Sequence, residues 1–96
     1  MDPSVSPLGA ETVPRVAPKA RLHWDEVRER HVLLYPEGLV ALNETAAAIL
    51  QLCDGERPIE QIVATLKLRY QADGIERDVA ALLQGLAAKG LVTYAP

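Results

Sequence analysis

The sequence predicts an α+β domain in which a three-stranded antiparallel sheet is followed by three helices, an order like that of a winged helix-turn-helix protein. Before Asn43, apolar residues alternate with polar ones, which is typical of strands. After Asn43 they recur every three to four residues, which is typical of helices. Strands and helices are therefore segregated along the chain, and this segregation indicates the α+β class.

The first part of the chain is rich in proline. Four of the seven prolines fall in the first 18 residues, among Ser, Gly and Ala, and no apolar period accompanies them. We therefore expect residues 1–19 to form an extended, unpacked tail and residues 20–96 to form the folded domain. Residues 93–96 are expected to fray at the other end.

Three short strands are expected at the start of the domain. Apolar and polar residues alternate on both sides of a charged stretch at residues 26–30. Pro36 and Gly38 then mark a turn, because proline presets φ and glycine is permissive. Residues 39–42 complete the meander. Alternation places the lone Trp24 on the apolar face, where we expect it to pack the sheet onto the helices; the alternative is an anchor for a partner.

Three helices are expected in the second half. Asn43 is a good N-cap for the first helix, and Pro58 suits the first position of the second. Asp73 and Glu76 have the spacing of a capping box that would open the third helix. Gly90 is expected to end that helix in a Schellman motif.

Composition argues against several classes of function. Ten Lys and Arg stand against thirteen Asp and Glu, a net charge of −3, which lacks the basic footprint of nucleic-acid binding. The single cysteine, Cys53, excludes an internal disulfide and fits a reducing compartment, so we expect a cytoplasmic protein. The longest apolar runs have five residues, so no membrane partner is expected.

No pattern indicates catalysis or a resident cofactor. His23, His31 and Cys53 do not pair at a spacing that places two metal ligands on one element, so no metal site is expected. The serines lie in the first 19 residues, and the glycines are scattered singly rather than gathered in a phosphate-binding loop. We therefore expect a protein without catalytic residues that binds another polypeptide.

Two features indicate where such a polypeptide would bind. The expected third strand, residues 39–42, is apolar on both faces and has no charge or proline to protect an exposed edge from pairing. On the third helix small residues flank the apolar stripe, with Ala80 and Ala87 on one side and Ala81 and Gly85 on the other. Glycine costs a helix about 1 kcal/mol relative to alanine, which either close approach of a partner or tight internal packing would explain.

Several segments resemble the PqqD family of pyrroloquinoline quinone biosynthesis. The resemblance is carried by residues 42–55 (LNETAAAILQLCDG), with agreement in order and spacing at residues 14–18, 24–25, 33–38, 60–63, 78–86 and 89–92. One departure is Arg28-Glu29-Arg30, where many relatives have a glycine in the first hairpin. This departure concerns the type of turn.

The resemblance implies a RiPP recognition element, a peptide chaperone that binds the precursor peptide PqqA and presents it to the radical SAM enzyme PqqE. In such elements the peptide commonly adds as a strand beside the third strand and packs against the third helix. The iron–sulfur cluster and S-adenosylmethionine would belong to the partner enzyme, so no cofactor is expected here. The peptide-binding residues implied are Leu39, Val40, Ala41, Leu42, Ala80, Leu83, Gln84 and Ala87.

Three other interpretations stay open. A winged-helix DNA-binding protein would place the third helix in the major groove, although residues 75–89 carry two acidic and two basic residues and no net charge. A recognition element of another peptide-modifying pathway would share the same fold. Pairing of two copies through the exposed edge would give a homodimer.

Overall fold

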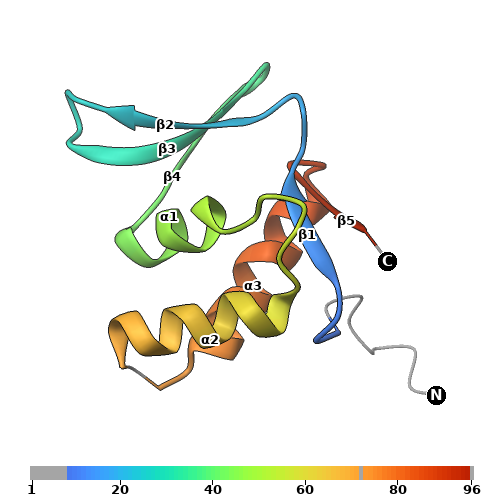
Figure 1. Cartoon of the computed structure of the whole chain (residues 1–96). Helices are drawn as coiled ribbons and strands as arrows, with labels where there is room; N and C mark the ends of the chain where they lie inside the picture. Colours follow the sequence, from blue (N-terminus) through green and yellow to red (C-terminus); the bar gives the residue numbers. More distant parts are fainter. Residues whose placement is uncertain (1–8, 72, 96) are drawn as a thin grey trace.

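The computed structural model describes residues 9–71 and 73–95 and confirms the α+β class. A three-stranded sheet packs over α1, and α2 and α3 lie beyond it (Figure 1). The elements in chain order are β1 (Val13–Val16), β2 (Arg21–Asp25), β3 (Arg30–Tyr35), β4 (Gly38–Ala41), α1 (Glu44–Gln51), α2 (Ile59–Tyr70), α3 (Ile75–Ala88) and β5 (Val92–Ala95).

Strands β2, β3 and β4 form the expected antiparallel meander, in the order β2-β3-β4. The register aligns Leu22 with Leu33 and Leu33 with Val40. Leu33 is completely buried, and Leu22 and Val40 pack beside it against the core. A slip of one residue would turn Leu33 to the opposite face of the sheet, so its burial fixes the register.

The hairpin between β2 and β3 contains a residue in the left-handed conformation, Glu29, with φ of 53°. The Asp25 carboxylate accepts hydrogen bonds from the backbone N–H groups of Val27 and Arg28 and pairs with the Arg28 guanidinium. These interactions, led by the hydrogen bond from the Arg28 backbone, hold the pKa of Asp25 below its ordinary value. The left-handed residue lies at the centre of the Arg28-Glu29-Arg30 stretch.

The helices bury one face each in a common core. The buried residues of α1 are Ala47, Ala48, Ile49 and Leu50, those of α2 are Ile59, Ile62 and Leu66, and those of α3 are Ile75, Val79, Leu83 and Leu86. This arrangement follows the spacing of apolar residues in the sequence. No helix within the described residues is long and apolar enough to cross a membrane.

The helix ends agree with the sequence at two positions and differ at two. The Asn43 side chain accepts a hydrogen bond from the Ala46 N–H at 2.7 Å, the expected N-cap. Gly90, with φ of 74°, ends α3 in the expected Schellman motif. Pro58, however, is the N-cap of α2 rather than its first residue. Left-handed Gly74, not Asp73, precedes α3, and no side chain caps that end.

The expectation of an unpacked tail up to residue 19 is wrong for residues 13–17, and the expected fraying is wrong for residues 93–95. Val13–Val16 pairs antiparallel with Val92–Ala95, and the Ala17 N–H donates to the Leu91 carbonyl at 2.8 Å. Pro14 is fully buried within this pairing. The two paired strands are distant in sequence, so no local periodicity of apolar residues predicts their pairing. Residues 1–8 of the expected tail lie outside the described residues.

The segment before β1 caps the N-terminus of α2. The Ile59 N–H donates to the Thr12 carbonyl at 2.8 Å, and the Glu60 N–H donates to the Ala10 carbonyl at 3.0 Å. The first turn of a helix has N–H groups without partners inside the helix, and Pro58 offers no side-chain acceptor. Backbone carbonyls from residues 10–12 therefore take the place of a capping side chain.

We predict that deleting residues 1–12 destabilises the protein and that deleting residues 1–8 does not. The longer deletion removes both carbonyls that accept from α2, which should lower the free energy of unfolding by about 1–2 kcal/mol. For a domain of this size that is a fall in Tm of about 5 °C or more. Thermal denaturation followed by circular dichroism measures both variants, and equal melting temperatures for the two would contradict this role of residues 10–12.

Candidate functional site

Among the described residues, the backbone groups at the outer edge of β4 have no strand partner. The Leu42 N–H donates to the His31 carbonyl at 3.0 Å, so Leu42 directs its backbone groups toward β3. Successive residues of an antiparallel strand point these groups in alternate directions. Val40 therefore also bonds β3, and the N–H and C=O groups of Leu39 and Ala41 point away from the sheet.

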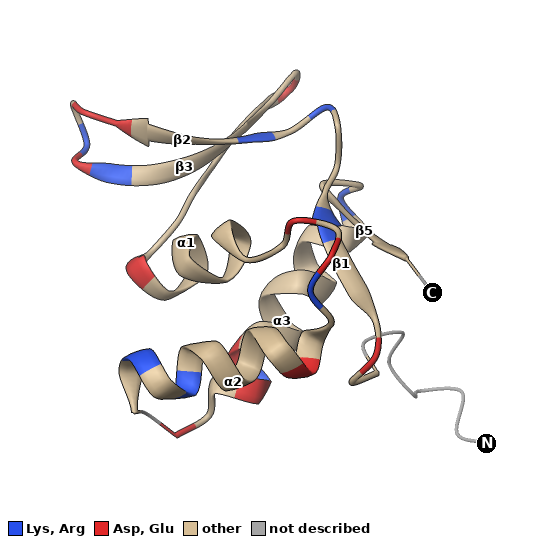
Figure 2. Cartoon of the chain, in the orientation of Figure 1, with Lys and Arg blue, Asp and Glu red and all other residues tan. Residues whose placement is uncertain are grey.

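The side chains of β4 leave this edge accessible and uncharged. Leu39 is 41% exposed and Ala41 is exposed, while Val40 packs against the core. Figure 2 shows that acidic residues flank the strand, Glu37 before it and Glu44 after it, and that none lies within it. An edge strand without lysine, proline or bulge is open to pairing with another chain.

A groove of about 250 Å³ continues from the end of β4 between α1 and α3. On the α1 side it is lined by Asn43, Thr45, Ala46 and Ile49, and on the α3 side by Asp78, Ala81 and Leu82. Asn43 is two residues beyond Ala41, the last residue of β4. The groove therefore begins two residues after the end of β4 and has the flank of α3 that bears Ala81 as its other wall.

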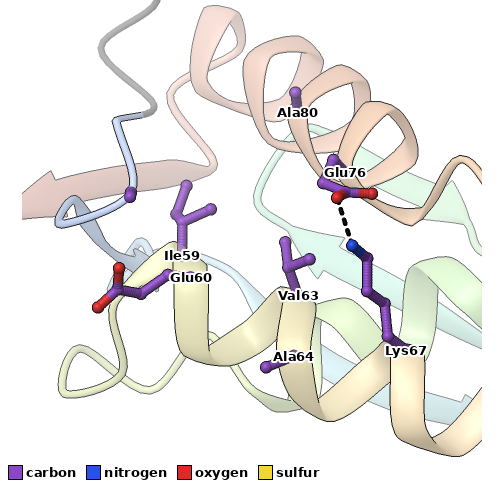
Figure 3. A pocket seen from close by; sticks show the side chains of 8 residues that line it. Ile59, Glu60, Val63, Ala64, Lys67, Glu76 and Ala80 are labelled. Atoms are coloured by element: carbon purple, nitrogen blue, oxygen red, sulfur yellow. Dashed lines mark hydrogen bonds and ion pairs between the residues drawn. The ribbon is translucent and has the colours of Figure 1, made fainter.

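The opposite flank of α3 borders a different cavity, of about 440 Å³, between α2, α3 and the segment before β1. Ile59, Val63 and Ala80 point into it, and an ion pair between Lys67 and Glu76 lies at one end (Figure 3). The hydrogen bond from Lys67 holds the pKa of Glu76 below its ordinary value.

The structure separates the eight residues expected to bind peptide. Leu39 and Ala41 lie at the open edge, and Val40 lies between them with its side chain inward. Leu42 is only 3% exposed and Leu83 is fully buried, because both side chains belong to the core. These two side chains are therefore not available to a ligand.

The remaining three expected residues lie on α3 and are not in the lining of the α1–α3 groove. Ala80 lines the cavity beside α2, Gln84 is exposed, and Ala87 is half-buried. The flank that faces α1 instead carries Ala81 and Leu82. Helix periodicity predicts which stripe of α3 is buried, but it does not predict which neighbour packs on either side of that stripe.

Gly85 lies one turn after Ala81 on this flank, since residues four apart share a helix face. A Cβ atom added at Gly85 would have no heavy atom within 4 Å, so internal packing does not account for the glycine. Of the two explanations that the sequence left open, close approach of a partner is the one that fits this geometry.

The groups considered for chemistry are far apart or inert. Among residues 9–71 and 73–95, no three His, Cys, Asp or Glu side chains are grouped so as to hold a metal ion. The buried Cys53 thiol donates to the Ile49 carbonyl, and burial raises its pKa to about 12. A thiol that keeps its proton at neutral pH is a poor nucleophile.

Trp24 differs from the expectation that it packs the sheet onto the helices. It lies on the face of the sheet that bears Leu22, as expected, but 48% of its surface is exposed. Its ring meets the ring of His31 edge to face, with centroids 5.0 Å apart. An aromatic residue this exposed contributes only part of its apolar surface to the core.

The fold and this site define a small α+β domain whose sheet edge lies open beside a helical groove. A sequence profile described as "Coenzyme PQQ synthesis protein D (PqqD)" matches residues 30–92. With relatives that cover most of its length at more than 40% identity, the chain belongs to the PqqD family.

Two relatives and one solved structure illustrate the similarity. A "PqqA binding protein" of Methylococcus capsulatus is 45% identical over 85 residues, which cover 88% of this chain and 91% of the relative. One of Rhodopseudomonas palustris is 49% identical over 94 residues, covering 96% and 89%. A solution structure of the PqqD part of Methylobacterium extorquens PqqCD, described as a stand-alone RiPP recognition element, has a TM-score of 0.73 at 43% identity, covering 84% of this chain and 88% of that one.

We predict that Gly85→Ala stabilises the folded protein by about 1 kcal/mol, because alanine is the better helix former and the added methyl group enters open space. Urea denaturation measures the change. The converse substitution at an exposed interior position of the same helix, Ala81→Gly, is the matched control and should destabilise by a similar amount. A destabilising effect of Gly85→Ala would show that the glycine is needed for packing within the chain.

Proposed function

We propose that the protein binds the precursor peptide PqqA through the edge of β4 and presents it to the radical SAM enzyme PqqE, without catalysing a reaction itself. The observation that carries this proposal is the open, uncharged edge of β4. The family membership of the chain supports the choice of peptide, since relatives that cover most of the chain are named PqqA binding proteins. The assignment of PqqE rests on the resemblance of the sequence to the family.

Strand addition explains how affinity would arise. A peptide strand beside β4 would exchange hydrogen bonds with the N–H and C=O groups of Leu39 and Ala41, each contributing about 1 kcal/mol. Peptide side chains on one face would meet the α1–α3 groove near Ala81 and Leu82. Main-chain bonds would supply affinity for any extended chain, and the groove would supply preference for one sequence.

Presentation follows from the same geometry. A strand added to β4 is held along one edge, while its other edge and outer face stay accessible to an enzyme. The chemistry would belong to that enzyme, because the one cysteine of this chain is buried and protonated. The protein would therefore act by holding the peptide extended and by raising its local concentration at the enzyme.

We predict that peptide binding protects the amides of Leu39 and Ala41 from hydrogen exchange. Both should exchange rapidly in the free protein, because their N–H groups point away from β3, and slowly with synthetic PqqA of Methylococcus capsulatus. The amides of Val40 and Leu42 should be protected in both states. Exchange followed by ¹H–¹⁵N NMR measures all four. Unchanged rates at Leu39 and Ala41 with saturating peptide would rule out strand addition at β4.

A proline scan of β4 gives an independent prediction. Ala41→Pro removes an outward N–H and should weaken peptide binding by at least about 1 kcal/mol while leaving the fold intact. Val40→Pro removes an inward N–H that bonds β3, so it should destabilise the sheet itself. Calorimetric titration measures binding, and circular dichroism separates the two effects. Full affinity in a folded Ala41→Pro variant would contradict the proposed edge.

We also predict that the two flanks of α3 respond differently to a bulky charge. Ala81→Glu fills the groove beside α1 and should weaken PqqA binding at least tenfold. Ala80→Glu, the same change one residue earlier, adds its side chain to the cavity beside α2 and not to the groove. It should therefore leave affinity within about twofold, a difference of about 0.4 kcal/mol. A stronger loss of affinity for Ala80→Glu than for Ala81→Glu would indicate that the peptide binds the flank that bears Ala80, as the sequence predicts.

A further inference from the structure

A second cavity lies at the other side of Asn43 from the α1–α3 groove. Its volume is about 330 Å³. Trp24 is its exposed apolar wall, with His31 edge-on to the tryptophan ring, and Leu42, which also borders it, is only 3% exposed. Glu29, Arg30 and Glu44 line the rest. The cavity therefore combines a half-exposed aromatic surface with charged side chains at its rim.

The charges at this rim are not compensated within the protein. Within the described part of the chain, Glu29, Arg30 and Glu44 form no ion pair, whereas neighbouring Asp25 pairs with Arg28. Two carboxylates and one guanidinium leave one negative charge in excess. Figure 2 shows charged residues of both signs at the tip of the β2–β3 hairpin and an acidic residue at the start of α1.

The backbone at Glu29 gives a separate indication of function. Its φ of 53° is a left-handed conformation that glycine adopts without strain and that costs other residues about 1 kcal/mol or more. A glutamate at this position makes the folded protein less stable than a glycine would, but it places a carboxylate at the rim of the cavity. Strained residues of this kind gather where a side chain is used for binding.

We infer that this cavity binds a lysine or arginine side chain of the peptide that lies along β4. The methylene groups of such a side chain would cover the exposed face of Trp24, and its cationic head would lie between Glu29 and Glu44. A neutral apolar side chain would leave both carboxylates without a partner, and an acidic one would be repelled by the excess negative charge. This inference rests on the proposed function and adds a second, charge-selective contact to it.

The position of the cavity connects it to the strand site. Leu42 and Glu44 follow β4 in the chain, and each extended residue advances about 3.3 Å. A peptide paired with Leu39 and Ala41 therefore reaches Glu44 within about three residues of the end of the ladder. One peptide can occupy the β4 edge and the cavity together.

The test uses ¹⁵N-labelled protein and unlabelled synthetic PqqA of Methylococcus capsulatus. Trp24 is the only tryptophan, so a single indole N–H signal reports on the cavity. Saturating peptide should shift this signal together with the amides of Leu39 and Ala41. Shifts at the β4 amides with an unmoved indole signal would overturn the cavity while leaving the strand site intact, and no binding at all would overturn both.

A double-mutant cycle identifies the charge that enters. Each lysine or arginine of the peptide is replaced in turn by norleucine, which keeps the stem and removes the charge. One replacement should weaken binding five- to tenfold to the wild-type protein and less than twofold to the Glu29→Gln/Glu44→Gln variant. Glu37→Gln, the same change in the turn before β4, is the matched control and should keep the full effect. Equal effects on the wild type and the double variant would overturn the inference.

Discussion

The register of β4 on β3 is the constraint on which the site depends. The buried Leu33 and the inward Val40 leave one alignment of these strands, and that alignment turns the backbone groups of Leu39 and Ala41 outward. A shift by one residue would expose Val40 and place different groups at the edge. The packing that stabilises the sheet therefore also selects which hydrogen bonds a partner strand finds.

The helices give this edge its surroundings. Because α1 starts directly after β4, its first turn lies beside the edge, and α3 packs along the same end of α1. Asn43 serves both purposes, since its side chain caps α1 and its position divides the α1–α3 groove from the cavity beside Trp24. The two proposed recognition surfaces thus share Asn43 as a wall, and its hydrogen bond to the Ala46 N–H holds that wall in place.

Local patterns predicted most of the fold but only part of the site. Alternation around Trp24 and the helical period after Asn43 reveal the meander and the three helices, because each signal lies within a few turns of chain. The pairing of β1 with β5 depends on residues distant in sequence, and Pro14 resembles an unpacked tail. The choice between Ala80 and Ala81 on α3 depends on which helix packs on each flank, and the outward direction of Leu39 depends on register. The spacing of apolar residues in the sequence predicts neither the packing on each flank of α3 nor the register of β4.

The pairing of the two ends of the domain has a consequence for how the chain folds as it is synthesised. Val13 pairs with Ala95, so the ladder closes a loop of roughly eighty residues, the longest closure among the strand pairings of the described residues. The β2–β3–β4 meander needs only partners nearby in sequence and can form before β5 has been synthesised. Pro14 finds its partner strand only once β5 is available. A nascent chain would thus have its β4 edge in place before β5 joins β1.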